Sequence, residues 1–218
     1  MTKTGAATGP ALDDHADSAL DWMRANAKAI GIGVAVAALA AIVWIVAKQY
    51  RERQSDAAEV ALNRARQSYA QGNLPLAQTD LRRVIARYEG SSAGSQATML
   101  LAQAYYEQSK PDSGLKVLND GKAADTDEPA FEALKGAGFE QKKEYAQAAT
   151  RYQAAANLAS AKIAKDRYLA DAARALTSAG KKDEAAKIWS SLATDPKSTL
   201  GAEARVRLGE LTATPASK

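Results

Sequence analysis

Apolar residues are arranged along this chain in two ways, one continuous and one periodic. Residues 29–47, AIGIGVAVAALAAIVWIVA, form an apolar run without a single charge. From residue 56 onward, apolar residues instead recur every three or four positions, as they do on one face of an α-helix. The pattern predicts an all-α protein with one N-terminal apolar helix followed by a series of amphipathic helices.

Turn residues divide the periodic part into helix pairs. Gly72 and Asn73 separate the first two helices, and Pro111, Pro129 and Gly180 mark later boundaries. Asn73 and Asp127 are expected to cap helices whose first turns contain prolines, where proline is tolerated. The expected helices lie near 56–71 and 75–89, 93–108 and 112–121, a third pair that starts after Pro129 and turns near Lys142, 163–179 and 182–194, and a last helix at 199–211.

Small residues recur in the first helix of each pair. Ala65, Ala102, Gly136 and Ala173 are spaced by 37, 34 and 37 residues. In the second helices an alanine or glycine is followed four positions later by a large residue, for example Trp189. A small residue lets two helices approach, and the large residue fills the space beside the crossing.

These helix pairs resemble tetratricopeptide repeats, which are helix–turn–helix units of about 34 residues. The resemblance implies an α-solenoid of about four degenerate units and a closing helix. The units depart from the family pattern, because the tryptophan and leucine of the first helix are mostly missing, the first unit has Arg64 and Ser68 at matching places, and three-residue insertions occur.

The apolar run 29–47 is predicted to be a transmembrane helix. At about 1.5 Å per residue it reaches roughly 28 Å, which is enough to cross the hydrocarbon core of a bilayer. A signal peptide is the alternative, but the preceding 28 residues carry a net negative charge and no small-x-small cleavage site follows the run. The residues expected at the membrane interface are Lys28, Trp44, Lys48, Arg51 and Arg53.

Small residues recur every four positions within the same run. Such a face lets another membrane helix approach closely. The alternative is that glycine and alanine are simply common in helices of this kind. The residues expected to pack against a second helix are Gly31, Gly33, Ala35, Ala37 and Ala41.

The division of the chain follows from these features. Residues 1–28 are expected to be an N-terminal tail with a short amphipathic helix, and 29–47 is the span. No glycine or proline lies between 48 and 71, so this segment is predicted to be a helical stalk that merges into the first repeat helix. The solenoid is expected over 56–211 and a disordered tail over 212–218.

Charge excludes one class of partner and leaves the orientation open. The net charge is +4, and no basic stripe alternates with stacking aromatic residues, so nucleic acid is not an expected partner. Two cations precede the span within fifteen residues and three follow it. This difference leans slightly towards a cytoplasmic C-terminus, although the rule weakens for long domains.

The order of the parts resembles the bitopic tetratricopeptide proteins typified by the ancillary subunit of the bacterial Sec translocon. The segment ALDWMRANAKAIGIGV, residues 19–34, is similar to the membrane entry of that family. The resemblance implies a bacterial inner membrane protein with a cytoplasmic N-terminus and periplasmic repeats, against the lean of the charges. The implied partners are the translocon, the lipid bilayer and periplasmic chaperones. The alternative function is a structural accessory subunit that packs into another membrane assembly, respiratory or photosynthetic.

No residue pattern indicates catalysis, a metal or a cofactor. Cysteine is absent and there is one histidine. Serine precedes lysine by three positions at Ser113 and Ser178, but the companion motifs of serine acyltransferases are missing. An enzyme carried on a membrane anchor is the weakest interpretation, and a non-enzymatic interaction scaffold the strongest.

The partner-binding surface is expected on the inner face of the solenoid, which first helices line. Helical phase relative to the aligned small residues selects the side chains that point into it, and tyrosine and arginine are frequent interface anchors. The alternative is that the two tyrosines pack between neighbouring repeats. The selected residues are Arg66, Tyr69, Gln103, Tyr106, Glu107 and Arg174.

Overall fold

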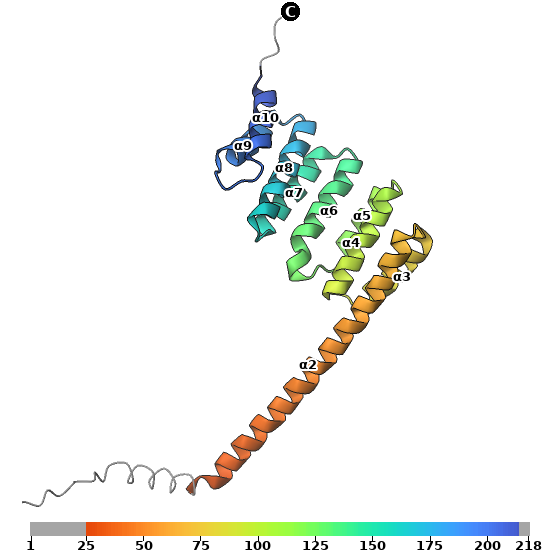
Figure 1. Ribbon diagram of the computed structural model, residues 1–218, viewed down its shortest axis with the longest axis vertical. Coiled ribbons are helices and arrows are strands. Elements are labelled where there is room, and N and C mark those ends of the chain that lie inside the picture. The colour runs from red at the N-terminus through yellow and green to blue at the C-terminus, as the bar shows by residue number, and fades with distance from the viewer. Residues whose placement is uncertain (1–24, 214–218) are drawn as a thin grey trace, which may run out of the picture. The chain divides into compact units, whose positions relative to one another are not determined.

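The computed structural model describes residues 25–213, and every regular element in that range is a helix (Figure 1). The predicted all-α class is confirmed, and the repeat helices from residue 74 onward begin and end within about two residues of the expected bounds. The amphipathic helix and the tail expected before residue 25 and after residue 213 lie outside the described residues. The helices are α2 (Ala27–Ala70), α3 (Leu74–Arg87), α4 (Ser92–Glu107), α5 (Pro111–Asp120), the 3-10 helix η1 (Asp125–Asp127), α6 (Glu128–Gln141), α7 (Tyr145–Leu158), α8 (Lys162–Ser178), α9 (Lys182–Thr194) and α10 (Gly201–Thr212).

The chain divides after Gln54 into two compact units. The described part of the first unit is helical, as the sequence predicts for 29–47. Within the residues that the structure describes, no helix combines the length and the apolar character that a membrane crossing needs. The structure therefore confirms a helix at 29–47 and does not confirm the crossing predicted for it.

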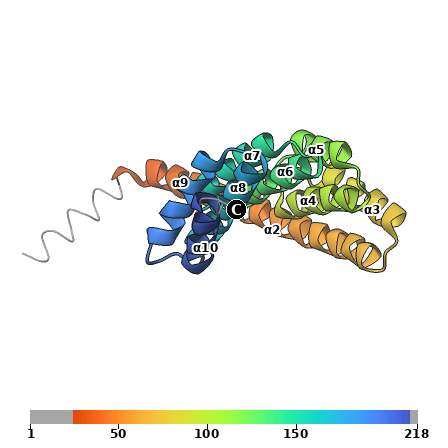
Figure 2. The same ribbon diagram turned by 90° about the horizontal axis from the view of Figure 1, so that it is seen from above.

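The second unit is a stack of antiparallel helix pairs. Each helix from α3 to α10 packs against the next one along the chain, and the first helices α4 and α6 of neighbouring pairs also touch. Figure 2 shows α5 and α7 toward one side of the stack and α4 and α10 toward the other. This is the two-layer arrangement that a solenoid of helix pairs requires.

One backbone conformation marks the turn inside every pair. A residue in the left-handed region follows each first helix, and the amide of the next residue donates to a carbonyl five positions earlier, over 2.9–3.0 Å. The spacings of this turn residue are again 37, 34 and 37, so the register inferred from the small residues is confirmed. The four turn residues are Gly72, Ser109, Lys143 and Gly180, with φ of 74°, 56°, 61° and 77°.

Replacing the turn glycine of the fourth pair tests the need for this conformation. Gly180 has φ of +77°, and a Cβ added there would meet no atom within 4 Å, so backbone strain alone opposes alanine. We expect Gly180→Ala to lower the free energy of unfolding by about 1 kcal/mol. Gly209 inside α10 has equally open surroundings, and Gly209→Ala should raise it by about 0.5–1 kcal/mol. Urea unfolding followed by circular dichroism measures both free energies. Changes of the same sign in the two variants would contradict backbone strain at Gly180.

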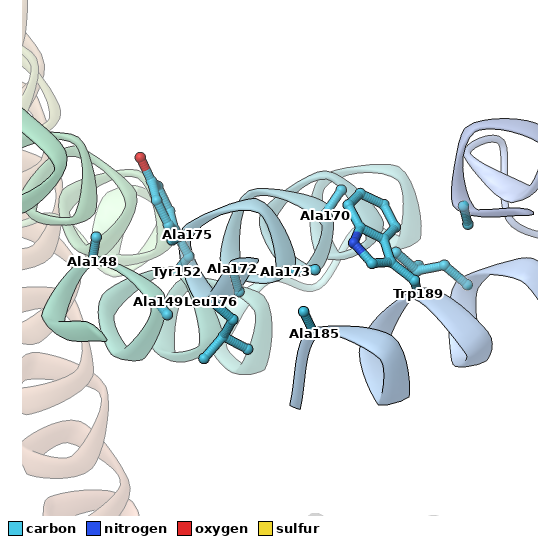
Figure 3. Packing of buried hydrophobic residues seen from close by; sticks show 12 residues of the cluster. Ala148, Ala149, Tyr152, Ala170, Ala172, Ala173, Ala175, Leu176, Ala185 and Trp189 are labelled. Carbon is cyan, nitrogen blue, oxygen red and sulfur yellow. The ribbon is translucent and has the colours of Figure 1, made fainter. Parts of the chain in front are cut away.

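The core is built from the small and large residues that the repeats alternate. One cluster joins Tyr152 and Trp189 to alanines of α7, α8 and α9 (Figure 3). Two further clusters lie around Leu62 and Leu81, and around Tyr106 and Phe131. The expected pairing of small with large is confirmed in detail. A Cβ added to Gly136 would lie 2.8 Å from the Tyr152 ring, which therefore needs a glycine opposite it.

The two predicted caps differ. The Asn73 side chain accepts a hydrogen bond from the Leu76 amide at 3.3 Å and begins α3, as expected. Asp127 occupies the cap position of α6 but accepts no such bond, and one of its carboxylate oxygens is buried without a partner. The prediction for Asp127 was therefore wrong, because its backbone already lies in the helical region at a φ of −101°, where the side chain does not reach back to the first turn.

Candidate functional site

A hollow of about 300 Å³ opens between the C-terminal part of α2 and α4. Its residues on α4 are spaced by three or four positions and so lie on one helix face. Met99 and Leu100 are half-buried and supply apolar surface, while Gln103 is exposed and supplies an amide. The hollow is lined by Arg66, Tyr69, Gln96, Met99, Leu100 and Gln103.

Side chains across this hollow are tied to one another. The Arg66 guanidinium donates to the Gln96 amide oxygen and, over 3.2 Å, to that of Asn63. The Tyr69 hydroxyl donates to the Glu107 carboxylate. Burial, followed by this bond to Glu107, raises the pKa of Tyr69 to about 12. The phenol therefore stays neutral at physiological pH and holds Glu107 beside the hollow.

Four of the six predicted groove residues come together here. Arg66, Tyr69 and Gln103 line the hollow, and Glu107 is bonded to Tyr69. Tyr106 is placed elsewhere, in the core, where 7% of it is exposed and its hydroxyl donates to the Leu134 carbonyl at 3.0 Å. Its place fits the alternative that this tyrosine packs between neighbouring repeats.

Arg174 lies at a second hollow, of about 420 Å³, between α8, α9 and α10. Its guanidinium donates to Asp171 at 2.5 Å and to Glu203 at 2.7 Å, and it lies 5.8 Å from the centre of the Trp189 ring. Burial opposes the charge, but the bonds to Glu203 and Asp171 raise the pKa of Arg174. Burial also raises the pKa of Asp171, which Arg174 partly offsets. The Arg174 guanidinium is thus paired with two carboxylates of the protein.

The first unit carries the residues expected to meet a membrane. Gly31 and Gly33 have open surroundings, since an added Cβ would meet nothing within 4 Å, and Ala35 and Ala41 are exposed. Lys28 is also exposed, and the Lys48 amine lies 5.6 Å from the centre of the Trp44 ring. The side chains of Ala37, Arg51 and Arg53 lie outside the described residues.

Sequence reasoning missed half of the groove lining. Gln96, Met99 and Leu100 share a face with Gln103, and helical spacing from that residue is the signal that finds them. Trp189 under Arg174 had no such signal, because fifteen residues and a turn separate the two. Among the described residues, no group of three or more histidine, cysteine or carboxylate side chains is placed to hold a metal ion.

Comparison with known families matches the tetratricopeptide repeat-like domain to residues 56–170, more than half of the 218 residues. The chain belongs to this family. The match covers the first three helix pairs and the start of α8, so the structure extends the array by α9 and α10. A search of curated proteins found no match. Stacked repeats of this kind form extended binding surfaces for proteins, which makes the hollow on α4 a candidate interaction groove.

Proposed function

We propose that the protein is a non-enzymatic scaffold anchored to a membrane by residues 29–47, with a repeat domain that binds partner proteins through the groove on α4. Membership of the repeat family supports the binding role. The anchoring role is carried by one observation, the apolar side chains around the helix of the first unit.

Large apolar side chains are exposed along this helix. Their exposed fractions lie between 56% and 67%, so more than half of each of these residues is exposed. An apolar surface of this extent is unfavourable in water and marks a membrane or protein contact. It continues around the helix rather than along one stripe, as lipid contact requires. The residues are Ile32, Val36, Leu39, Ile42, Val43, Trp44, Ile45 and Val46.

The groove favours a partner segment with both apolar and amide groups. Met99 and Leu100 offer apolar surface, and the Gln103 amide can pair with a peptide backbone. By resemblance to the translocon ancillary subunits, we propose a bacterial inner membrane location, a cytoplasmic N-terminus and periplasmic repeats. The proposed partners are the translocon and periplasmic chaperones.

A structural accessory subunit of another membrane assembly is the second candidate. The open surroundings of Gly31 and Gly33 favour it, because a second helix can approach a glycine face closely. In that case 29–47 is indispensable for assembly, whereas the groove contributes little.

Purification of the full-length protein in mild detergent distinguishes the two candidates. We expect translocon subunits or periplasmic chaperones to co-purify, and Gln103→Ala with Met99→Ala to reduce their recovery about tenfold, the effect of losing a few interface anchors. Thr199→Ala, at an exposed position far from the groove, is the matched control. A different stoichiometric complex that survives the groove variants and is lost when 29–47 is exchanged for a neutral span would make the protein a structural subunit.

A further inference from the structure

A third hollow, of about 180 Å³, lies on the seam of α2 and α3, and no residue of α4 lines it. Arg66 and Arg82 of the same two helices reach α4 instead, where they donate to Gln96 and Tyr105. The hollow therefore lies on the end of the stack of pairs, which we call the terminal face. It is lined by Ala61, Arg64, Asp80, Arg83, Val84, Arg87 and Tyr88.

The repeat register relates the terminal face to an internal surface of the third pair. A hollow of about 350 Å³ lies there, between α6 and α7 on one side and the preceding helix α5 on the other. Five lining positions correspond through the spacings of 37 and 34 residues. They are Ala61 with Glu132, Arg64 with Lys135, Asp80 with Arg151, Arg83 with Ala154, and Arg87 with Leu158.

In the third pair this surface is neutralised and covered. Glu132 accepts from Lys135 at 2.8 Å and from Arg151 at 3.1 Å. Burial opposes the charge of Glu132, but these two cations lower its pKa. The helix α5 supplies the other wall with Leu118, and Phe131 beneath it is only 3% exposed. The third pair thus has a carboxylate beside its two cations and an apolar side chain of α5 that covers its surface.

The terminal face lacks a carboxylate at the position of Glu132 and has no described helix of the repeat array covering it. Ala61 takes the place of Glu132, so the carboxylate beside the cation is missing, while Arg83 and Arg87 replace an alanine and a leucine. Three guanidiniums line the hollow with one carboxylate, Asp80, which accepts from Arg83 at 3.0 Å.

Apolar side chains flank these charges. Val60 corresponds to Phe131 and is 64% exposed, and Leu76 is 47% exposed on the side of α3 that carries Asp80 and Arg83. The terminal face therefore combines net positive charge with uncovered apolar surface, in the register of a surface that a helix covers elsewhere in the chain.

We propose that the terminal face docks an acidic amphipathic helix of another protein, which lies on α2 and α3 as α5 lies on α6. A carboxylate of that helix binds Arg64 and Arg87 and takes the part that Glu132 has in the third pair. Apolar residues of the helix cover Val60, as Leu118 covers Phe131. Arginine suits this role because its planar guanidinium pairs with carboxylates through two hydrogen bonds.

The test uses full-length protein in mild detergent and a labelled synthetic helix of about 14 residues, near the length at which isolated helices form. The peptide carries two leucines four positions apart, flanked by glutamates. We expect saturable binding by fluorescence anisotropy, weakened about tenfold when Arg64→Ala and Arg87→Ala are combined, or when glutamine replaces the glutamates. Val60→Ser should weaken binding severalfold, and Arg205→Ala, an exposed arginine of α10, should leave it unchanged.

Five results would overturn the proposal. Binding that ignores the arginine variants, or that the glutamine peptide matches, removes the role of charge. If Gln103→Ala abolishes peptide binding, the peptide binds the groove on α4 and not the terminal face. If only the proposed partner binding through that groove fails, peptide binding to the terminal face remains intact. Self-association that Arg64→Ala and Arg87→Ala abolish makes the face a contact between two copies. Tighter peptide binding after Asp13→Asn and Asp17→Asn makes the chain's own acidic segment the occupant.

Discussion

Tyr106→Ala is expected to lower the free energy of unfolding of the repeat domain by about 3–5 kcal/mol, the range for truncating a buried aromatic residue. The ring is 7% exposed and is enclosed by two glycines of other helices. A Cβ added to Gly114 would lie 2.2 Å from its ring, and one added to Gly138 would lie 2.5 Å from its hydroxyl. Neither glycine has a side chain that could move into the cavity, so the loss is expected in full.

A graded series separates packing from hydrogen bonding. Tyr106→Phe keeps the ring and removes the hydroxyl that donates to the Leu134 carbonyl, which should cost about 1 kcal/mol. Tyr69→Ala, at a half-buried position on the groove, should cost less than about 1.5 kcal/mol. Urea unfolding in mild detergent, followed by the far-ultraviolet circular dichroism signal, gives all three values. If Tyr106→Ala proved no more destabilising than Tyr69→Ala, the ring would not be part of the core.

The fold could be predicted from the sequence because the same local pattern of small, large and turn residues recurs in each helix pair. Ala65, Ala102, Gly136 and Ala173 gave the register, and each turn repeats the same left-handed residue at the matching position. Nothing in the sequence singled out Ser109 and Lys143 as turn residues in the left-handed region, because glycine is the usual signal for it. Their conformation follows from the register and not from their own preference.

The groove was only partly predictable, because helical phase predicts the direction in which a side chain points and not how deeply it is buried. Tyr106 and Tyr69 both lie on first helices, yet one is buried and the other lines a hollow. Gly114 and Gly138 decide the difference by making room for the Tyr106 ring, and they come from helices that only the fold brings together. The carboxylate missing from the terminal face is likewise recognised only when the first helix pair is compared with the third.

Because the proposed membrane anchor is the apolar helix at 29–47, two aspartates in its middle are expected to release the protein from the membrane. Leu39 and Val43 lie near the centre of 29–47 on one helix face, and their exposed fractions are 62% and 67%. On the insertion scale an aspartate at the centre costs about 2.5–3.5 kcal/mol, whereas leucine and valine each contribute about −0.3 to −0.6 kcal/mol. Leu39→Asp with Val43→Asp therefore costs about 6–8 kcal/mol, and most of the protein should leave the membrane pellet in an alkaline carbonate wash.

Ile163→Asp with Val206→Asp provides the matched control, because these residues of the repeat domain are equally exposed, at 66% and 61%. The control pair should leave the pellet fraction unchanged, so that a loss specific to 29–47 reflects lipid contact and not general solubility. The chain has no cysteine, so Thr4→Cys and Thr199→Cys can report the side of the membrane on which each residue lies. A membrane-impermeant maleimide applied to intact cells should label only the Thr199→Cys variant. Release of wild-type protein by the wash would show that the exposed apolar side chains meet a protein partner instead of the bilayer.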